Sequence, residues 1–468
     1  MTPSCFERAK AAHAAGDLDG AAELYARAAA ESPADHRALH NLGAVMEALG
    51  RHDDAASAYR RALEIRPDSA WTVYNLARTG HLAGDLDAAE TGYRRSLELD
   101  PSLAEACFNL GRLLLERGDA GSGETALRQG LGLDPDDAGA LSFLGDALFA
   151  QRRVPEALAA YRRTVELEPL DSAAQYDVAK SLESMARLDE AVSCYRRCVE
   201  LEPTGVAGRE GLIRALDAQG HRDQAVAETR EWLSLAPGHP AAVHLLASLG
   251  AAEPPARASD AYVRGTFDRF AADFDATLDR LAYRAPQLWR RRSRRARGEP
   301  HADLDILDLG CGTGLCASHL RPFARRLEGV DLSAAMLARA RRRGGYDALH
   351  EAELTRFLSD YASSWDVIAA ADTLCYFGAL EPVLRVAARA LRVDGLLVFT
   401  LERREGGGVA LEPHGRYAHG EDAVRGALAA AGLDGAVERA ALRREGGLPV
   451  EGMVVTARAS SESRYSNA

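Results

Sequence analysis

A short glycine-rich stretch holds the residues whose types and spacing best suit chemistry. An apolar run at 304–309 leads directly into Gly310, Gly312 and Gly314. Glycine lets a backbone turn sharply and approach a ligand with no Cβ in the way. Seventeen residues after Gly314, Asp331 ends a second apolar run. A carboxylate there is placed to accept hydrogen bonds from two ribose hydroxyls, so the pattern predicts a nucleotide-like ligand.

Two kinds of protein use such a loop, and its spacing distinguishes them. The glycines read G-x-G-x-G rather than the G-x-G-x-x-G of NAD-binding loops, and Asp308 precedes them. Asp331 is followed by Ser333, Met336 and Leu337. These segments resemble the D-L-G-C-G-T-G and D-x-S-x-x-M-L motifs of class I S-adenosylmethionine-dependent methyltransferases. The resemblance implies a methyltransferase with S-adenosyl-L-methionine as its cofactor, and it disfavours hydride transfer.

The same resemblance assigns residues to the cofactor. Glu353 follows the third expected strand, where the family's acidic residue lies beside the adenine amino group. Tyr262, Phe267, Phe270 and Phe274 have helical spacing before the glycine loop, where the family often has a helix that covers the cofactor. Their alternative role is to anchor that helix on the sheet. The set implied for the cofactor is Asp308, Gly310, Cys311, Gly312, Gly314, Asp331, Leu332, Met336, Glu353, Leu354, Asp372 and Tyr262.

Methyl transfer requires little acid–base chemistry from the protein. Holding donor and acceptor in line and excluding water supplies most of the rate, and a base is needed only when the acceptor loses a proton. Asp372, at the carboxyl end of the fourth expected strand, and His419 are candidate bases. Tyr376 and Tyr417 are candidates for orienting the acceptor. The alternative roles are structural, with Asp372 capping a helix and His419 standing before the last helix.

Absent motifs narrow the acceptor. No N/D-P-P-Y follows the fourth expected strand, which disfavours exocyclic base amines and glutamine amides. No Pro-Cys pair stands there, which disfavours pyrimidine C5, and no pair of glutamates brackets the region as in arginine methyltransferases. The methylated atom stays open.

The elements that must position these residues alternate between strands and helices. Because strands buried on both faces read as continuous apolar runs, a parallel sheet is expected after residue 260. A helix is expected from about Leu315. In the order of the family, we predict an α/β Rossmann-like domain over 261–459, with a mostly parallel seven-stranded sheet, a terminal antiparallel hairpin and a disordered tail at 460–468. The expected strands are 304–309, 327–331, 349–353, 365–372, 395–401, 436–442 and 452–457, and the later helices are 379–391 and 421–431.

A fixed interval of prolines dominates the first half of the chain. A 34-residue interval is the length of a tetratricopeptide repeat, which consists of two antiparallel helices. A small residue recurs where the helices touch, with an aromatic residue four positions on, as at Ala55 and Tyr59. The chain resembles tetratricopeptide proteins over about 4–241, so we predict an all-α solenoid over 1–250, ending in a capping helix, and a linker over 251–260. The seven prolines are Pro33, Pro67, Pro101, Pro135, Pro169, Pro203 and Pro237.

One column of the repeats suggests a docking groove. Asn41, Asn75 and Asn109 stand at equivalent positions on the helix that lines a solenoid's concave face. Their amides could hydrogen-bond an extended peptide backbone with both donor and acceptor, and Arg78 and Arg112 lie nearby. The alternative is drift of the repeat consensus.

The net charge and the cysteine content limit the kinds of partner and the cellular compartment that are expected. The formal net charge of −12 argues against a nucleic-acid partner. No run of 18 apolar residues predicts a membrane span, and the N-terminus lacks the basic and apolar regions of a signal peptide. The seven cysteines show no zinc spacing, so no metal is predicted, and buried thiols in a reducing cytoplasm are the simplest interpretation.

Repeats and methyltransferase motifs together resemble a bacterial group of predicted repeat-containing methyltransferases. We expect a cytoplasmic S-adenosylmethionine-dependent methyltransferase whose repeats dock a protein or peptide, as substrate or as partner. A second interpretation is methylation of a small metabolite, with the repeats used for complex assembly. A non-catalytic scaffold with a vestigial cofactor fold is disfavoured, because the glycine loop and Asp331 are intact.

Overall fold

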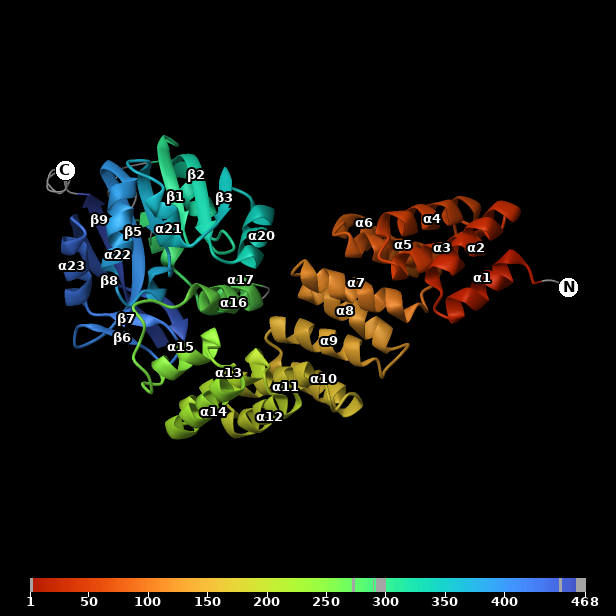
Figure 1. Ribbon diagram of the computed structural model, residues 1–468, viewed down its shortest axis with the longest axis horizontal. Helices are drawn as coiled ribbons and strands as arrows, with labels where there is room; N and C mark the ends of the chain where they lie inside the picture. Colours follow the sequence, from red (N-terminus) through yellow and green to blue (C-terminus); the bar gives the residue numbers. More distant parts are fainter. Residues whose placement is uncertain (1–2, 272–273, 289, 292–299, 446–447, 460–468) are drawn as a thin grey trace. The chain divides into compact units, whose positions relative to one another are not determined.

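The computed structural model describes residues 3–271, 274–288, 290–291, 300–445 and 448–459. They divide into two compact units, Met1–Pro203 and Thr204–Ala468 (Figure 1). The predicted tail at 460–468 lies outside the described residues.

The first unit consists of helical hairpins that repeat every 34 residues. The repeat prolines stand just after the second helix of each pair, as Pro67 follows the helix that ends at Ile65. Proline cannot continue a helix, because it lacks the N–H and clashes with the preceding turn. The described helices of this unit are α1 Cys5–Ala14, α2 Leu18–Glu31, α3 His36–Ala48, α4 His52–Ile65, α5 Ala70–Leu82, α6 Leu86–Leu99, α7 Ala104–Glu116, α8 Ala120–Leu131, α9 Ala138–Ala150, α10 Val154–Leu167, α11 Ser172–Ser184 and α12 Leu188–Leu201.

Close contact between paired helices explains the small and aromatic residues of the repeat. A Cβ on Gly43 would lie 2.5 Å from the ring of Tyr59, and one on Gly145 would lie 2.3 Å from the ring of Tyr161. Both tyrosines are almost completely buried. A side chain at either glycine would push the helices apart, so the predicted all-α tetratricopeptide solenoid is confirmed.

The seventh hairpin belongs to the second unit. Helices α13 (Val206–Ala218) and α14 (Arg222–Leu235) keep the repeat spacing, and α15 (Pro240–Ser248) stands where the capping helix is predicted. The boundary between the compact units, after Pro203, thus falls inside the region predicted as one solenoid over 1–250. Side-chain contacts distant in sequence bind this repeat to the α/β domain, and such contacts leave no local pattern in the chain.

The predicted linker, 251–260, is not helical except at Asp260, which begins the next helix. The linker is nevertheless held by hydrogen bonds. The N–H of Ala258 donates to the carbonyl of Tyr376 at 2.8 Å, and the N–H of Ala379 donates to the carbonyl of Ala256 at 2.7 Å. The hydroxyl of Tyr417 donates to the carbonyl of Pro255 at 2.5 Å. The segment therefore runs as an extended chain along 376–379 before α16 (Asp260–Phe270) begins.

A mostly parallel sheet forms the centre of the second unit. Its strands run in the order β3-β2-β1-β4-β5-β7-β6, and β9 pairs antiparallel with both β5 and β8. The predicted fold class is confirmed, and the described sheet has nine strands because the short pair β6–β7 joins the seven expected. The strands are β1 Leu304–Leu309, β2 Ala324–Asp331, β3 Ala348–Glu351, β4 Trp365–Ala370, β5 Leu391–Arg403, β6 Val409–Leu411, β7 Tyr417–His419, β8 Leu433–Glu445 and β9 Leu448–Ala459.

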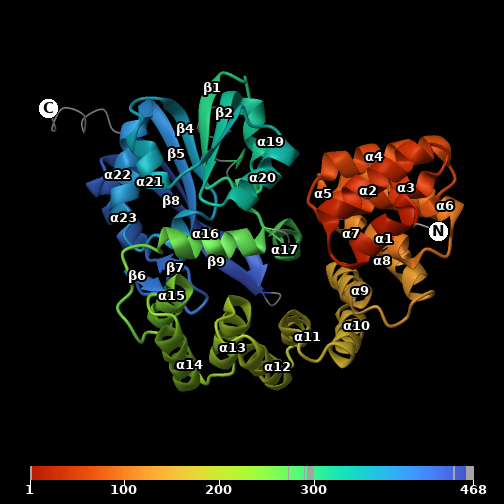
Figure 2. The same ribbon diagram turned by 45° about the vertical axis from the view of Figure 1, so that its right-hand side comes forward.

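Both faces of the sheet are buried, as the apolar runs predict. Neighbouring residues of one strand belong to different core clusters, since Leu307 packs in one and Ile306 in the other. This alternation is the two-residue period of a strand. Figure 2 shows α21 (Leu354–Ser359), α22 (Glu381–Ala390) and α23 (Glu421–Ala430) on one side and α19 (Ala317–Leu320) and α20 (Ala334–Arg343) on the other.

The described part of the chain has neither a membrane-spanning helix nor a cluster of metal-ligating side chains. No helix there is long and apolar enough to cross a membrane. No group of three or more potential metal-ligating side chains is found among those residues.

Candidate functional site

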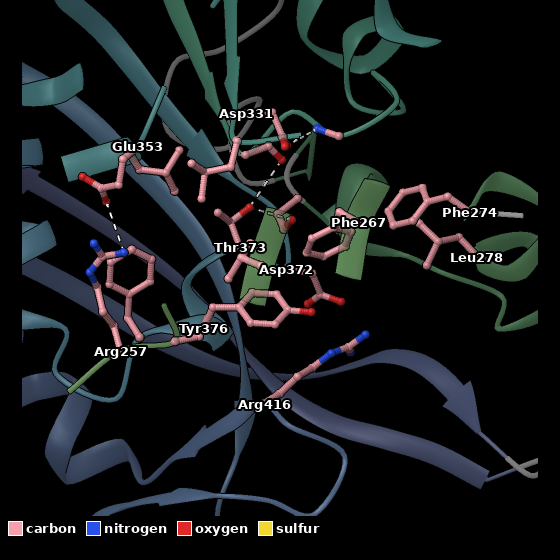
Figure 3. Close-up of a pocket in the computed structure, with 18 of the residues that line it drawn as sticks. Arg257, Phe267, Phe274, Leu278, Asp331, Glu353, Asp372, Thr373, Tyr376 and Arg416 are labelled. Atoms are coloured by element: carbon pink, nitrogen blue, oxygen red, sulfur yellow. Dashed lines mark hydrogen bonds and ion pairs between the residues drawn. The ribbon is translucent and has the colours of Figure 1, made fainter. Parts of the chain in front are cut away.

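A pocket opens where the parallel strands end. It lies at the carboxyl ends of β1, β2, β3 and β4, the edge at which open α/β sheets bind their ligands. Helices α16 and α17 (Phe274–Arg280) cover it with aromatic and apolar side chains (Figure 3). Its lining residues are Arg257, Ala258, Val263, Phe267, Phe274, Leu278, Tyr283, Gly310, Gly312, Asp331, Leu332, Glu353, Leu354, Ala371, Asp372, Thr373, Tyr376, Phe377 and Arg416.

The glycine loop forms one wall of the pocket. Gly310 has φ +75°, and a Cβ there would lie 2.3 Å from the side chain of Thr373. Gly312 has φ +55°, and a Cβ there would meet nothing closer than the ring of Phe274 at 3.8 Å. The first glycine is thus required by its neighbour, whereas the second keeps open the space that a ligand would fill.

Asp331 faces the loop from the end of β2. Its Oδ2 accepts the N–H of Gly312 at 2.9 Å, and its Oδ1 accepts the N–H of Ser333 at 2.9 Å. Burial raises the pKa of this carboxyl, while the hydrogen bonds from Ser333 and Gly312 act against the rise. An ionised carboxylate has about four acceptor positions, so two donors fix its orientation and leave acceptor capacity for hydroxyls of a ligand.

The far end of the pocket is apolar with an acidic rim. Leu332 and Leu354 line it and are largely buried. Glu353 is the N-cap of α21, accepting the N–H groups of Thr355 and Arg356 at 3.0 and 2.8 Å. Such a slot suits a flat heterocycle between two aliphatic side chains.

Other residues implied for the cofactor lie behind the pocket rather than on its surface. Asp308 is 1% exposed, and its Oδ2 accepts the hydroxyl of Tyr346 at 2.6 Å. Met336 is fully buried, and its backbone N–H donates to the Oγ of Ser333 at 3.1 Å. Cys311, a buried thiol whose pKa is raised by burial, and Gly314 are likewise absent from the residues that line the pocket. Asp308 and Met336 thus pack beneath the loop, whereas Cys311 and Gly314 belong to the loop and face away from the pocket.

Asp372 is held at the end of β4 in a strained conformation. Its φ is +53°, in the left-handed region that favours glycine. Its N–H donates to the Oγ1 of Thr400 at 2.8 Å, and the Thr400 hydroxyl donates back to Oδ1 at 3.3 Å. Thr373, not Asp372, is the N-cap residue of the short η2 helix (Leu374–Tyr376). The capping role considered for Asp372 is therefore absent, and its carboxyl faces the pocket.

A charged network that sequence reasoning missed lies beside Asp372. Glu402 Oε1 accepts Arg443 Nη2 at 2.6 Å and Arg416 Nη1 at 3.1 Å. Arg443 Nη1 also lies 3.6 Å from Asp372 Oδ2. Burial favours a raised pKa for Glu402, but a hydrogen bond from His414 and the two arginine charges lower it overall. Burial raises the pKa of Asp372, opposed by the charges of Arg416 and Arg443.

Tyr376, a candidate for orienting an acceptor, lines the pocket next to this network. Its ring packs edge-on against Phe267, with centroids 5.5 Å apart. Burial raises the pKa of its hydroxyl, while the charge of Arg416 acts against the rise. The phenol thus stays protonated and can donate a hydrogen bond to a bound molecule.

Three other predicted residues lie outside the pocket. Tyr417 is 2% exposed and donates to Pro255, which fixes the linker. His419 is fully buried in β7, where burial lowers its pKa and nearby backbone carbonyls act to raise it. Tyr262 stacks on His244 of α15, with ring centroids 4.0 Å apart. None of these three side chains is among the residues that line the pocket, whereas Asp372, the other candidate base, is.

The predicted lid residues divide between the pocket and the helix packing. Phe267 and Phe274 line the pocket, and Phe270 packs edge-on against Phe274 at 5.5 Å. Helix α17 is tied to the glycine loop, because Thr313 Oγ1 donates to Asp275 at 2.5 Å. The cover is therefore attached to the loop that it covers.

The groove candidates of the first unit have different environments. Asn75 is 8% exposed, so its amide is closed to a docked peptide. Asn109 donates to the Tyr74 hydroxyl and to the Glu105 carbonyl, both at 2.9 Å. Arg78 pairs with Glu47 at 2.8 Å. A hollow in this unit is lined by Tyr74, Glu105, Phe108, Asn109, Arg112, Asp137, Gly139, Ala140 and Phe143, whereas Asn41, half-buried on α3, is not among its lining residues.

Fold and pocket define a helical-repeat protein joined to an α/β domain of the methyltransferase type. Tetratricopeptide repeat models match residues 35–102, 108–175 and 172–204. A methyltransferase domain model matches residues 307–399. The chain therefore combines tetratricopeptide repeats with a methyltransferase domain.

Curated relatives align with parts of the chain. Methyltransferase-like protein 27 of Homo sapiens is 46% identical over 85 residues, which is 18% of this chain and 34% of the relative. A malonyl-[acyl-carrier protein] O-methyltransferase of Pectobacterium atrosepticum is 29% identical over 136 residues, 29% of this chain and 48% of the relative. The chain thus spans less than half the length of these relatives. Among solved structures, YrrB, described as a tetratricopeptide-repeat protein with an unusual peptide-binding site, is 23% identical, with a TM-score of 0.37 over 40% of this chain and 97% of YrrB.

Proposed function

We propose that this chain transfers a methyl group from S-adenosyl-L-methionine. The observation that carries the proposal is the placement of Asp331 against the glycine loop, with its carboxylate fixed by Gly312 and Ser333 and still able to accept two hydroxyls. The match to a methyltransferase domain over 307–399 supports it.

The residues present suit each part of that cofactor. Asp331 would hold the ribose hydroxyls, and Leu332 and Leu354 would enclose the adenine beside Glu353. The open side of Gly312 would admit the methionine portion, because a Cβ there would project toward Phe274 into the pocket. The polar and apolar surfaces of the pocket thus match the polar and apolar parts of the cofactor.

When bound, the cofactor supplies a methyl group on positively charged sulfur, already a good electrophile. The protein's task is to orient the acceptor and exclude water. Phe267, Phe274 and Leu278 form an apolar cover over the pocket. Tyr376 would orient the acceptor through its hydroxyl.

Asp372 is the residue we propose to take a proton from an acceptor that loses one. It lies at the carboxyl end of β4 and lines the pocket. Burial raises the pKa of this carboxyl, and a base is most effective when its pKa approaches the working pH. Thr400 and Arg443 hold the carboxyl in place.

The repeats, in this proposal, dock a protein or peptide as substrate or partner, in the cytoplasm. The hollow beside Phe108, Asn109 and Arg112 offers an aromatic ring, an amide and a guanidinium together, which suits a mixed polar and apolar peptide. Asn75, being buried, is not part of this surface. The alternative acceptor is a small metabolite, with the repeats serving assembly.

Calorimetric titration of the full chain tests the cofactor. We expect binding of S-adenosylhomocysteine, the product left after methyl transfer, and no binding of NAD. Binding of NAD in its place would overturn the class. Binding of S-adenosylhomocysteine without transfer to any lysate component would favour a non-catalytic scaffold.

An assay with radiolabelled cofactor against native lysate, separated into proteins and small molecules, tests the acceptor. Deleting residues 1–203 should leave cofactor affinity unchanged and lower protein labelling roughly 100-fold at low substrate, because docking raises the local substrate concentration. Equal labelling by the truncated chain would leave the metabolite alternative.

A further inference from the structure

His244 connects the capping helix of the tetratricopeptide array to two elements beside the pocket. It lies on α15 and is 3% exposed. Its ring stacks on Tyr262 of α16, with centroids 4.0 Å apart and an interplanar angle of 24°. Its Nε2–H donates to the carbonyl of Gly415 at 2.8 Å. One buried side chain of α15 thus contacts both the covering helix and the loop that leads to Arg416.

Each of these contacts stands next to pocket residues. Tyr262 begins the helix from which Val263 and Phe267 line the pocket. Gly415 directly precedes Arg416, which also lines the pocket. A shift of His244 would therefore move the cover and the arginine together.

A second contact holds the other end of the covering helix. Arg269, near the end of α16, donates to both carboxylate oxygens of Glu210 on α13, at 3.1 and 3.2 Å. The Glu210 side chain is 9% exposed and also accepts Arg214 at 3.0 Å. The Arg269 side chain is 41% exposed, so water screens the pair in part and its effect is that of a half-exposed ion pair. Helix α16 is thus fixed near both ends, by His244 of α15 and by Glu210 of α13.

The loop that carries Arg416 is shaped to receive the contact. Gly415 has φ +86°, and a Cβ there would lie 2.7 Å from the Tyr262 hydroxyl and 3.6 Å from the His244 ring. Within the loop, Gly415 N–H donates to Glu412 and Glu412 N–H donates to Arg416, at 2.8 and 2.9 Å. Gly415 therefore packs closely against Tyr262 and His244. This close packing leaves the loop at 412–416 little freedom to adopt another conformation.

We infer, on the basis of the proposed function, that His244 is a positioning residue of the active site, through which the capping helix α15 places helix α16 and Arg416. The end of the repeat array then packs on the preceding hairpin on one side and sets the geometry of the pocket on the other.

Three variants of the full chain test the inference. His244→Ala removes both contacts, whereas His244→Gln keeps a side-chain N–H for Gly415. His239→Ala is the matched control, because His239, the N-cap residue of the same helix, packs at an interplanar angle of 31° on Trp232 of α14, with centroids 4.6 Å apart. Three quantities are measured for each variant. They are the dissociation constant of S-adenosylhomocysteine at a temperature well below the melting temperature, the melting temperature itself, and the rate of backbone amide hydrogen exchange in residues 260–270 and 409–419.

We expect His244→Ala to weaken binding roughly 3- to 30-fold and to speed exchange in both segments. His244→Gln should recover most of the affinity, and His239→Ala should leave it unchanged even if its melting temperature falls. A His244→Ala protein that melts earlier but binds as tightly as the wild type would overturn the inference, since His244 would then be only structural.

Glu210→Gln keeps the inference testable if His244→Ala does not fold. It removes the charge that holds Arg269 and should weaken binding in the same direction, whereas unchanged affinity and exchange would count against the inference. If the wild type binds no S-adenosylhomocysteine, the proposed function fails, and the exchange rates of 260–270 and 409–419 still decide whether His244 positions them.

Discussion

The hydroxyl of Tyr346 donates a hydrogen bond of 2.6 Å to Oδ2 of Asp308, directly beneath the glycine loop. Asp308 is 1% exposed, and burial raises its pKa to about 7, although the bond from Tyr346 acts to lower it. This carboxyl therefore titrates near neutral pH in the folded protein.

The first prediction concerns stability against pH. The pKa of Asp308 rises from 3.8 to about 7 on folding, so the folded state holds the proton more tightly than the unfolded state. The wild type should thus lose stability relative to Asp308→Asn as pH rises from about 4 to 7, by at most about 4 kcal/mol, or about 1.4 kcal/mol per pH unit. Urea unfolding at several pH values measures the difference.

Asp360→Asn, which changes an exposed carboxyl, is the control for that experiment. Its stability relative to the wild type should vary much less over the same pH range. A constant difference between the wild type and Asp308→Asn would show that Asp308 is not the group that titrates.

The second prediction concerns the carboxylate of Asp331. Asp331→Ala should weaken S-adenosylhomocysteine binding by about 1.5–3 kcal/mol, roughly 10- to 150-fold, the range for hydrogen bonds to a charged group. Calorimetry on the full chain measures it, with Glu351→Ala, exposed at the end of β3, as control. Unchanged affinity would mean that the ribose is held elsewhere.

The third prediction separates backbone strain from crowding in the glycine loop. Gly310 and Gly406 have φ +75° and +86°, but a Cβ on Gly310 would lie 2.3 Å from Thr373, whereas one on Gly406 would meet nothing within 4 Å. Both alanine variants carry the left-handed penalty of about 1–2 kcal/mol. Gly310→Ala should in addition lose cofactor binding by roughly tenfold or more, and Gly406→Ala should keep it. Similar affinities in the two variants would contradict this account of the loop.

The fourth prediction concerns where the catalytic fragment can begin. A fragment from Thr204 keeps α13–α15, whereas one from Pro255 loses the partners of Tyr262, Gly415 and Arg269. We expect the longer fragment to bind S-adenosylhomocysteine as the full chain does. The shorter one should melt lower, by about 2–4 °C for each kcal/mol lost. Circular dichroism and calorimetry compare the two, and equal behaviour would show that the seventh repeat is dispensable.

Structural features that depend on one continuous stretch of sequence could be predicted. The repeat prolines, the glycine loop and Asp331 each act through their own backbone or their nearest neighbours, so their spacing alone identifies them. The same holds for the parallel strands, because burial on both faces makes them apolar throughout. Seven strands, the fold class and several residues of the pocket wall follow from such local patterns.

Features made by distant partners could not be predicted. Arg416 lines the pocket because Glu402 and Gly415 hold it, and these residues form no motif with it. Tyr262 and His419 have residue types common in active sites, but their surroundings turn them toward α15 and the core. Asn75 shares a column with Asn109 and is nevertheless buried. In each case the surroundings come from the folded structure and leave no pattern in the neighbouring sequence.

The last hairpin and the capping helix are attached to the α/β domain through Glu210 and His244. This attachment limits how the sequence of such a chain can change during evolution. Duplication or loss of whole 34-residue units before residue 204 changes the length of the array and leaves both anchoring residues in place. The final unit cannot be exchanged for a copy of an earlier one without loss, because Glu210 pairs with Arg269 and the same repeat position carries no acid in the six units before it. Those equivalent positions are Phe6, His40, Tyr74, Phe108, Ser142 and Tyr176. The first six units are therefore free to vary, while the seventh must vary together with the methyltransferase domain that it contacts.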